Sequence, residues 1–265
     1  MLAAIPYFPQ PTFRIGPLTL HSFGMLVATG ILVGTWIGGR RVRKAGLDPE
    51  PFGDYALFML VIAFISAHVL EILFYRPEAL LDDPLLLLRV WDGISSYGGF
   101  VGAILGALIW TRRNLPDRRA RWIYFDATAY ALPFGWLFGR LGCFTAHDHP
   151  GIASNFPLAV DFPPDYFGPG QGGPHLDLGL LEAIYTFFLC LLFLALGRKR
   201  RPLGFYLAIL PILYAPVRFF FDEFRIVDRR YLGLTPGQYF SVAFLVIGLW
   251  VWRVRPREDT AAEPT

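Results

Sequence analysis

The chain has 265 residues, of which 54% are hydrophobic and only 17% are charged, and its mean hydropathy is +0.44. Soluble domains carry about 25% charged residues, so this composition excludes an ordinary soluble protein. The length leaves room for several membrane spans of roughly 20 residues each. The formal net charge of +3 is small, so the placement of the basic residues is more informative than their sum.

Seven apolar stretches predict membrane-spanning helices. In chain order they cover residues 18–38, 53–75, 95–111, 122–140, 178–197, 204–222 and 236–253. Pro211 and Pro216 fall inside the sixth stretch, where membrane helices tolerate proline if neighbouring groups satisfy the freed carbonyls. We expect an all-α integral membrane protein in which residues 1–257 form one seven-helix domain. The acidic tail 258–265 is expected to be short and disordered.

Lysine and arginine concentrate in alternate loops between these stretches. Sixteen of the 24 basic residues lie in the first, third and fifth loops and in the C-terminal tail: Arg40, Arg41, Arg43, Lys44, Arg112, Arg113, Arg118, Arg119, Arg121, Arg198, Lys199, Arg200, Arg201, Arg253, Arg255 and Arg257. Cytoplasmic loops carry an excess of Lys and Arg. We therefore expect the N-terminus outside and the C-terminus in the cytoplasm, which an odd number of spans satisfies.

This topology predicts that polar residues far apart in the sequence meet in one layer. Arg140 ends the fourth predicted helix and Arg218 and Asp222 end the sixth, while Tyr97 and Glu182 open the third and fifth. All five would then lie at the outer boundary of the membrane. Two guanidinium groups at this depth suit an anionic lipid phosphate. The alternative is that both arginines reach the headgroups or pair with nearby carboxylates.

The long outer segment, residues 141–177, carries several possible metal ligands. His147, His149 and His175 could bind a divalent metal, which would make the protein a metal-dependent hydrolase. A His-x-His pair in a loop is weak support for a metal, so we expect no metal ion and no cofactor. Cys143 could be a nucleophile, but it matches no defined Cys–His pattern. We expect no disulfide between Cys143 and Cys190.

Glycines four residues apart occur in two predicted helices. Such spacing lets another helix approach closely, and helix packing is the first interpretation of Gly98, Gly102, Gly106, Gly135 and Gly139. Tyr97 precedes the first of these sets and could reach a ligand.

The chain resembles the prolipoprotein diacylglyceryl transferase family in stretches spread over most of its length. Gly-Arg-Leu-Gly-Cys-Phe, with Arg140 second, resembles the family's Gly-Arg-x-Gly-Asn-Phe motif and is the most specific match. Tyr-Gly-Gly, beginning at Tyr97, resembles its His-Gly-Gly motif. Further similar stretches are Ser-Phe-Gly at 22–24, the segment 175–182, and the Tyr, Arg and Gln region at 214–225 and 233–238.

The resemblance implies an inner-membrane enzyme without a nucleic-acid partner. It would move the diacylglyceryl group of phosphatidylglycerol to the thiol of a prolipoprotein lipobox cysteine. Arg140 and Arg218 would bind the lipid phosphate and stabilise the leaving group, with Tyr97 as the third catalytic position, since preorganised donors act in this way. The implied substrate-binding residues are Arg140, Arg218, Glu182, Asp222, Tyr214, Gly98, Gly99 and Cys143.

Several positions depart from the family pattern. Tyr97 stands where the family often has a histidine that assists deprotonation of the thiol, and a phenol with a pKa near about 10 is a poor base at neutral pH. Phe23 replaces a tyrosine, Cys143 an asparagine and Asp222 a glutamate. These departures leave two alternatives open: a phospholipid-binding membrane protein without covalent chemistry, and a transferase with a different acceptor.

Overall fold

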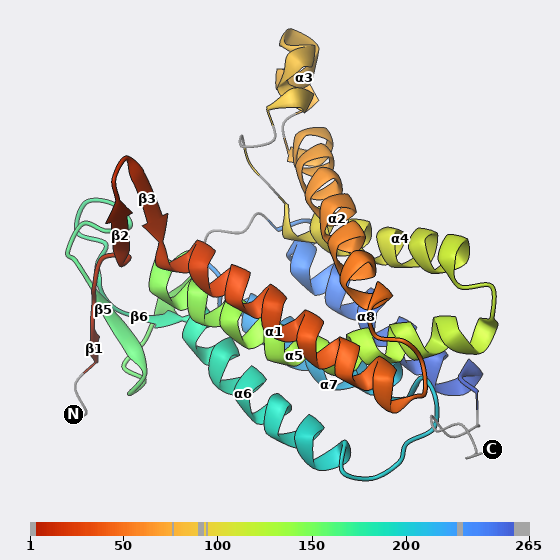
Figure 1. The fold of residues 1–265 in the computed structure, drawn as a ribbon. Coiled ribbons are helices and arrows are strands. Elements are labelled where there is room, and N and C mark those ends of the chain that lie inside the picture. The colour runs from red at the N-terminus through yellow and green to blue at the C-terminus, as the bar shows by residue number, and fades with distance from the viewer. Residues whose placement is uncertain (1–3, 76, 90–92, 94, 227–229, 257–265) are drawn as a thin grey trace. The chain divides into compact units, whose positions relative to one another are not determined.

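A computed structural model describes the chain except for residues 1–3, 76, 90–92, 94, 227–229 and 257–265 (Figure 1). The side chains of residues 74, 75, 77, 81, 96 and 97 are also outside the description. The helices are α1 Ser22–Lys44, α2 Pro51–Tyr75, α3 Pro77–Asp82, α4 Ser96–Asn114, α5 Arg118–Ala146, α6 Leu178–Leu196, α7 Phe205–Glu223 and α8 Pro236–Val254, with a 3-10 turn η1 at Pro84–Leu88.

The described residues also form six short strands, which the sequence analysis did not predict. They are β1 Ile5–Pro6, β2 Thr12–Ile15, β3 Leu18–His21, β4 Pro150–Ala153, β5 Ala159–Phe162 and β6 Gly173–Asp177. One sheet has the order β1-β5-β6-β4, with β1 parallel to β5 and the other pairs antiparallel. β2 and β3 form a separate hairpin. The fold is nevertheless mostly helical, as predicted.

Each predicted membrane stretch overlaps one long helix, but the helices differ in hydropathy. Within the described part of the chain, five helices are long and apolar enough to cross a membrane: α1, residues Pro51–Leu73 of α2, α6, α7 and α8. α4 is rich in glycine and has two arginines in its last turn. α5 carries Asp126 and Arg140 within its length, and it extends beyond the predicted 122–140 at both ends. The protein is therefore a multi-pass helical membrane protein.

The contacts within the chain define two compact units. Unit 1 comprises Met1–Trp36, Ala129–Arg201 and Phe205–Arg255, and unit 2 comprises Ile37–Thr128, Pro202–Gly204 and Pro256–Thr265. Both units contain helix pairs that approach closely at small residues, as the glycine spacing predicted for Gly98, Gly102, Gly106 and Gly135. The prediction was wrong for Gly139, because a Cβ placed there would meet no atom within 4 Å.

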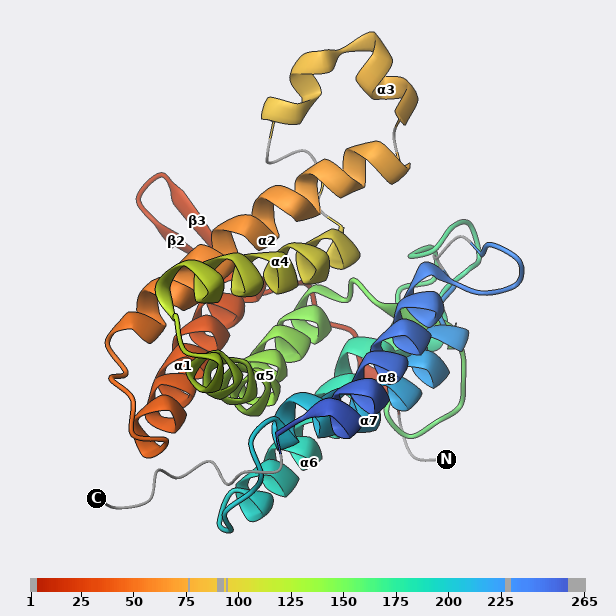
Figure 2. The same cartoon turned by 90° about the vertical axis from the view of Figure 1, so that its right-hand side faces the viewer.

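In unit 2, α2 and α4 run side by side (Figures 1 and 2). Gly98, Gly102 and Gly106 all face α2, and a Cβ placed on Gly102 would lie 2.6 Å from the carbonyl oxygen of Ile62. No larger residue fits this contact without moving the backbone. The hydrophobic core of this unit is formed by buried residues that include Phe52, Tyr55, Val42, Trp110 and Tyr124.

In unit 1, the first part of α1 crosses α5 at two glycines. A Cβ on Gly30 would lie 2.5 Å from the carbonyl oxygen of Gly135. α7 and α8 also lie side by side (Figure 2), with Gly248 of α8 against Pro211 of α7. These close approaches fix the helices that carry the predicted arginines.

Candidate functional site

Two arginines and one glutamate from three different helices form a buried cluster in unit 1. Nε of Arg140 on α5 lies 2.8 Å from Oε2 of Glu182 on α6. Arg218 on α7 forms an ion pair with the other oxygen, Oε1, of the same carboxylate. The Glu182 side chain is only 1% exposed. The structure thus brings Arg140 and Arg218, which are 78 positions apart, to the two sides of one carboxylate.

Tyr214 and Trp136 complete the packing around this carboxylate. The Tyr214 hydroxyl donates to Oε2 of Glu182 at 2.8 Å, and Nε1 of Trp136 donates to the Tyr214 oxygen at 2.8 Å. The Arg140 guanidinium lies over the Trp136 ring, with Cζ 4.6 Å from the ring centroid. Such cation–π contacts are stronger where water is excluded. Trp136 was not among the predicted site residues, although it lies one helical turn before Arg140 and so shares its face.

Asp222 holds the far side of Arg218. Its Oδ1 lies 2.6 Å from Nη2 of Arg218, one helical turn earlier on α7, and its Oδ2 accepts a hydrogen bond of 2.7 Å from the Thr235 hydroxyl. Thr235 is the N-cap of α8 and forms a capping box with Gln238. The start of α8 therefore fixes the Asp222 carboxylate, and Asp222 fixes the guanidinium.

The Nη1 nitrogen of Arg140 contacts weaker hydrogen-bond partners than its Nε nitrogen does. It lies 3.8 Å from Sγ of Cys143 and 3.3 Å from Nε2 of His149. Neither partner is a carboxylate, so a bound anion could replace them more easily than it could replace Glu182. Nη1 is thus the part of the Arg140 guanidinium that is best placed to turn toward a phosphate.

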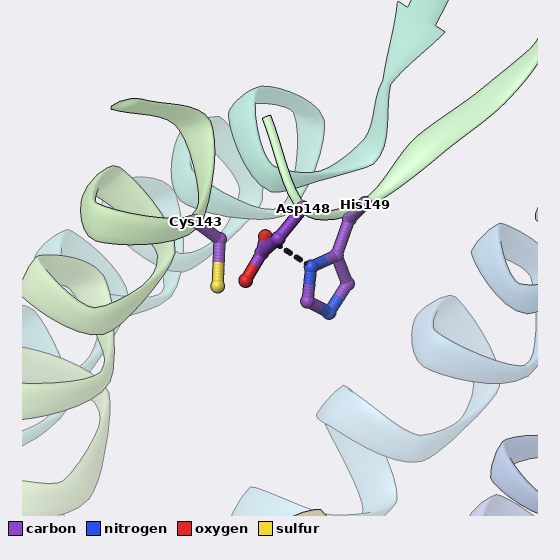
Figure 3. A group of neighbouring side chains, drawn as sticks. All are labelled: Cys143, Asp148 and His149. Carbon is purple, nitrogen blue, oxygen red and sulfur yellow. Dashed lines mark hydrogen bonds and ion pairs between the residues drawn. The ribbon is translucent and has the colours of Figure 1, made fainter. Parts of the chain in front are cut away.

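Cys143, Asp148 and His149 turn toward one another beside Arg140 (Figure 3). Asp148 and His149 are bonded through Oδ1 and Nδ1. Because a guanidinium can only donate, Nε2 of His149 must accept from Arg140, and the proton of the neutral ring lies on Nδ1. The ligating atoms of all three residues lie within 4.8 Å of one another. However, the positively charged guanidinium of Arg140 contacts both Cys143 and His149, and it would repel a bound cation.

The metal site considered from His147, His149 and His175 does not form. Within the described residues, the group of Cys143, Asp148 and His149 is the only one whose geometry could hold a metal. Nδ1 of His147 is 2.7 Å from Oδ2 of Asp177, and Nδ1 of His175 bonds the Gly173 carbonyl at 3.0 Å. Other partners therefore occupy two of the three histidines.

His147 instead fastens the end of α5 to the sheet of β1, β5, β6 and β4. Its two ring nitrogens face the Asp177 carboxylate and the Phe8 carbonyl. The rings of Tyr7, Phe8, Phe144 and Phe162 surround it. Burial raises the pKa of Tyr166, which packs on the same cluster. The segment 141–177 is therefore packed against the end of α5 rather than forming a free loop.

Tyr97, Gly98 and Gly99 belong to unit 2. Tyr97 lies in the first turn of α4, and its side chain is outside the description. A Cβ on Gly98 would lie 2.6 Å from the Ser66 carbonyl oxygen, so Gly98 has a packing role. His68, also in this unit, bonds the carbonyls of Gly93 and Leu86 at 3.1 and 3.2 Å. Cys143 and Cys190, which we expect to form no disulfide, are free and buried.

The fold and the cluster define a multi-pass membrane protein with a buried arginine–carboxylate site. The family model described as prolipoprotein diacylglyceryl transferase matches residues 10–254, and the chain belongs to this family of transferases.

Curated relatives cover the chain almost completely. The phosphatidylglycerol–prolipoprotein diacylglyceryl transferase of Allorhizobium ampelinum is 31% identical over 286 residues, which cover 100% of this chain and 96% of the relative. The enzyme of the same name from Janthinobacterium sp. is 31% identical over 96% of this chain and 98% of its own length. That of Salmonella arizonae is 30% identical over 97% of both chains.

Proposed function

We propose that the protein transfers the diacylglyceryl group of phosphatidylglycerol to the cysteine thiol of a prolipoprotein lipobox. The observation that carries this proposal is the cluster of Arg140 and Arg218 around Glu182. The family membership and the names of the relatives point to the same two substrates. The reaction takes place at the outer leaflet of the bacterial cytoplasmic membrane.

The two guanidinium groups bind the phosphate of the lipid. In the transfer, the thiol sulfur bonds to the glycerol carbon of the diacylglyceryl group, and the bond from that carbon to the phosphate oxygen breaks. Negative charge then grows on the departing glycerol phosphate. Donors that already point at the developing charge stabilise it without reorganisation. Glu182 and Asp222 orient the two arginines, and Tyr214 and Cys143 line the site. We also propose Tyr97, Gly98 and Gly99 as substrate-contacting residues, with Tyr97 as a hydrogen-bond donor.

We further propose seven spans, with the N-terminus outside and the C-terminus in the cytoplasm. In this topology α5 and α7 run outward and α6 runs inward. Arg140, Glu182 and Arg218 then share the outer ends of these helices, which agrees with their contacts within unit 1. The sixteen basic residues of the alternate loops lie at the opposite ends.

The test is a reaction of purified protein with phosphatidylglycerol vesicles and a synthetic lipobox peptide. We expect release of glycerol phosphate and a gain of one diacylglyceryl group in the mass of the peptide. Arg140→Ala should abolish both signals. If the native chain gives neither signal while an active relative gives both in parallel, the proposal is wrong.

Tyr97, in place of the motif histidine, supports one second candidate: a phospholipid-binding protein without covalent chemistry. In that case the native chain binds phosphatidylglycerol without turnover, and Arg140→Ala removes the binding. Tyr97→His and Tyr97→Phe separate the two candidates further. Equal activity of the native chain and Tyr97→Phe would show that the phenol hydroxyl has no chemical role.

A further inference from the structure

The proposed transfer needs a group that accepts the proton of the thiol, and this chain lacks the motif histidine. A thiol has an unperturbed pKa of about 8.5 and is mostly protonated at neutral pH. Arginines cannot accept a proton, and Glu182 is committed to two of them. The base must therefore be sought among the other groups that contact the arginine cluster.

His149 has the geometry of a general base. Its Nδ1 is hydrogen-bonded to the Asp148 carboxylate, and its Nε2 carries the lone pair that can accept a proton. A carboxylate bonded to Nδ1 holds a catalytic imidazole in the required tautomer and stabilises the imidazolium that forms. The His149 side chain is 15% exposed and that of Asp148 is 41% exposed. Both side chains are thus partly exposed, so an incoming peptide can reach the pair.

We infer that His149 is the catalytic base that deprotonates the acceptor thiol and that Asp148 positions it. This inference rests on the proposed function. The proton of the thiol moves to Nε2, and the sulfur electron pair forms the bond to the glycerol carbon. The carbon–oxygen bond breaks, and its electron pair leaves with glycerol phosphate between Arg140 and Arg218. The imidazolium then returns the proton to a phosphate oxygen or to water, so charge and atoms balance.

Arg140 contacts His149 and, in the proposed reaction, also binds the lipid phosphate. Nη1 of Arg140 lies 3.3 Å from Nε2 of His149 and donates to its lone pair. A phosphate attracts this guanidinium more strongly than a neutral imidazole does, so the bound lipid draws Nη1 away and frees Nε2. The base becomes available only after the donor lipid is in place, and the thiol is not deprotonated earlier.

Two other roles for this cluster are excluded on chemical grounds. If Cys143 took the diacylglyceryl group itself, the product would be a thioether, and a thiolate is too poor a leaving group on a saturated carbon for the group to move on. A metal bound by Cys143, Asp148 and His149 would lie against the Arg140 guanidinium, which contacts both the sulfur and Nε2.

The test compares His149→Gln and Asp148→Asn with the native protein in the vesicle and peptide reaction. A further histidine of the segment 141–177, His175, gives the matched control His175→Gln, because its Nδ1 bonds the local Gly173 carbonyl and not the arginine cluster. Loss of a general base lowers the rate by about 100-fold or more. We expect this loss in kcat for His149→Gln, with little change in KM for the lipid, a smaller loss for Asp148→Asn, and no loss for His175→Gln.

The pH profile separates a base from a structural residue. The groups that face His149 are Asp148 from its own loop, Arg140 and Cys143 from α5, and Glu182 from α6. In the native protein kcat rises with pH and then levels off, as it does in a reaction that needs a deprotonated base. In His149→Gln this limb disappears, and the rate rises only as the thiol itself ionises near about pH 8.5. Added imidazole should restore part of the activity of His149→Gly.

The outcomes are distinct. If His149→Gln keeps its rate within about threefold and keeps the native pH profile, the inference is wrong while the transferase proposal stands. If the native protein itself does not turn over, the proposed function fails first. If a chelator abolishes native activity and zinc restores it, the cluster is a metal site and His149 is not a free base. Lipid binding by each variant, measured in parallel, confirms that it is folded.

Discussion

At the scale of single residues, the site depends on one carboxylate that serves two cations. Glu182 is buried and contacts both Arg140 and Arg218. Transfer of a charge from water to a protein interior is unfavourable by several kcal/mol unless the charge is paired and hydrogen-bonded. Glu182 satisfies this condition for two guanidinium groups at once, so its removal affects binding and stability together.

Glu182→Gln therefore gives the first prediction. It keeps the shape of the side chain but leaves two buried guanidinium groups without their shared counter-charge. Breaking a buried ion pair by removing one partner typically costs about 3–5 kcal/mol. We expect a clearly lower melting temperature in detergent and a loss of glycerol phosphate release. Glu223→Gln is the control, because Glu223 pairs with Arg230 at the surface and exposed pairs contribute little. The amide oxygen of the new glutamine can still accept the hydrogen bond that Gln238 donates to Glu223. Equal effects of the two variants would contradict this account.

The hydrogen bonds around Glu182 give a second prediction, which is an order of effects. Tyr214→Phe removes the donor to Glu182 and also leaves Nε1 of Trp136 without its acceptor. An unsatisfied buried polar group costs about 1–3 kcal/mol. Trp136→Phe leaves the Tyr214 bond to Glu182 intact and keeps a ring beneath Arg140. We expect Tyr214→Phe to lower kcat and thermal stability more than Trp136→Phe does, and the reverse order would contradict the prediction.

At the scale of elements, the glycine spacing in α4 determines how closely α2 approaches. A Cβ at Gly102 would meet the Ile62 carbonyl oxygen at 2.6 Å, whereas a Cβ at Gly99 would meet only the Ala67 Cβ at 3.8 Å. The two glycines lie in the same helix but face different surroundings. Their substitution therefore tests packing within a single element.

Gly102→Ala should destabilise the protein, while Gly99→Ala should leave its stability almost unchanged. Overpacking a close contact typically costs about 1–3 kcal/mol, and the contact at Gly99 is an ordinary van der Waals distance. Thermal unfolding of both variants in the same detergent measures the difference. Similar melting temperatures would show that α2 and α4 do not depend on this contact. If Gly99→Ala keeps its stability but loses activity, Gly99 acts on the substrate.

The sequence predicted the long helices and missed the strands for a physical reason. Residues 12–21 alternate polar and apolar side chains on either side of Gly16, which is the period of a strand. The apolar stretch that follows is stronger, so we predicted a helix from residue 18, whereas α1 begins at Ser22. The hairpin has Phe13, Ile15, Leu18 and Leu20 on one face, as its register shows. The alternation of polar and apolar residues ahead of the membrane helix was the sequence signal that could have predicted this hairpin.

The site was partly predictable for similar reasons. Arg140, Arg218, Glu182 and Asp222 stand out because charges are rare in apolar helices. Trp136 and Thr235 do not, since aromatic and hydroxyl residues are common there. The Thr235–Gln238 capping pattern was readable as a helix start, but its bond to Asp222 depends on how α7 packs against α8. The pairing of His149 with Arg140 likewise depends on where the chain turns after α5.

At the scale of the whole molecule, the proposed topology places the loop after α6 in the cytoplasm and the segment between β5 and β6 outside. The first carries Arg198, Lys199, Arg200 and Arg201, and such clusters remain on the cytoplasmic side. The native cysteines are both buried, so single surface cysteines can report the side of each loop. Gln171→Cys and Arg200→Cys are suitable exposed positions.

In intact spheroplasts, a membrane-impermeant maleimide should label Gln171→Cys and should leave Arg200→Cys unlabelled until the membrane is opened. The physical reason is that the reagent reaches only the outer face, while the basic loop lies inside. The native protein is the control for reaction at Cys143 and Cys190. The opposite pattern would invert the protein, move the ends of α5 and α7 that carry Arg140 and Arg218 to the cytoplasmic face, and remove access for a secreted peptide. Labelling of both positions in intact cells would mean that α6, the helix between them, does not cross the membrane as proposed.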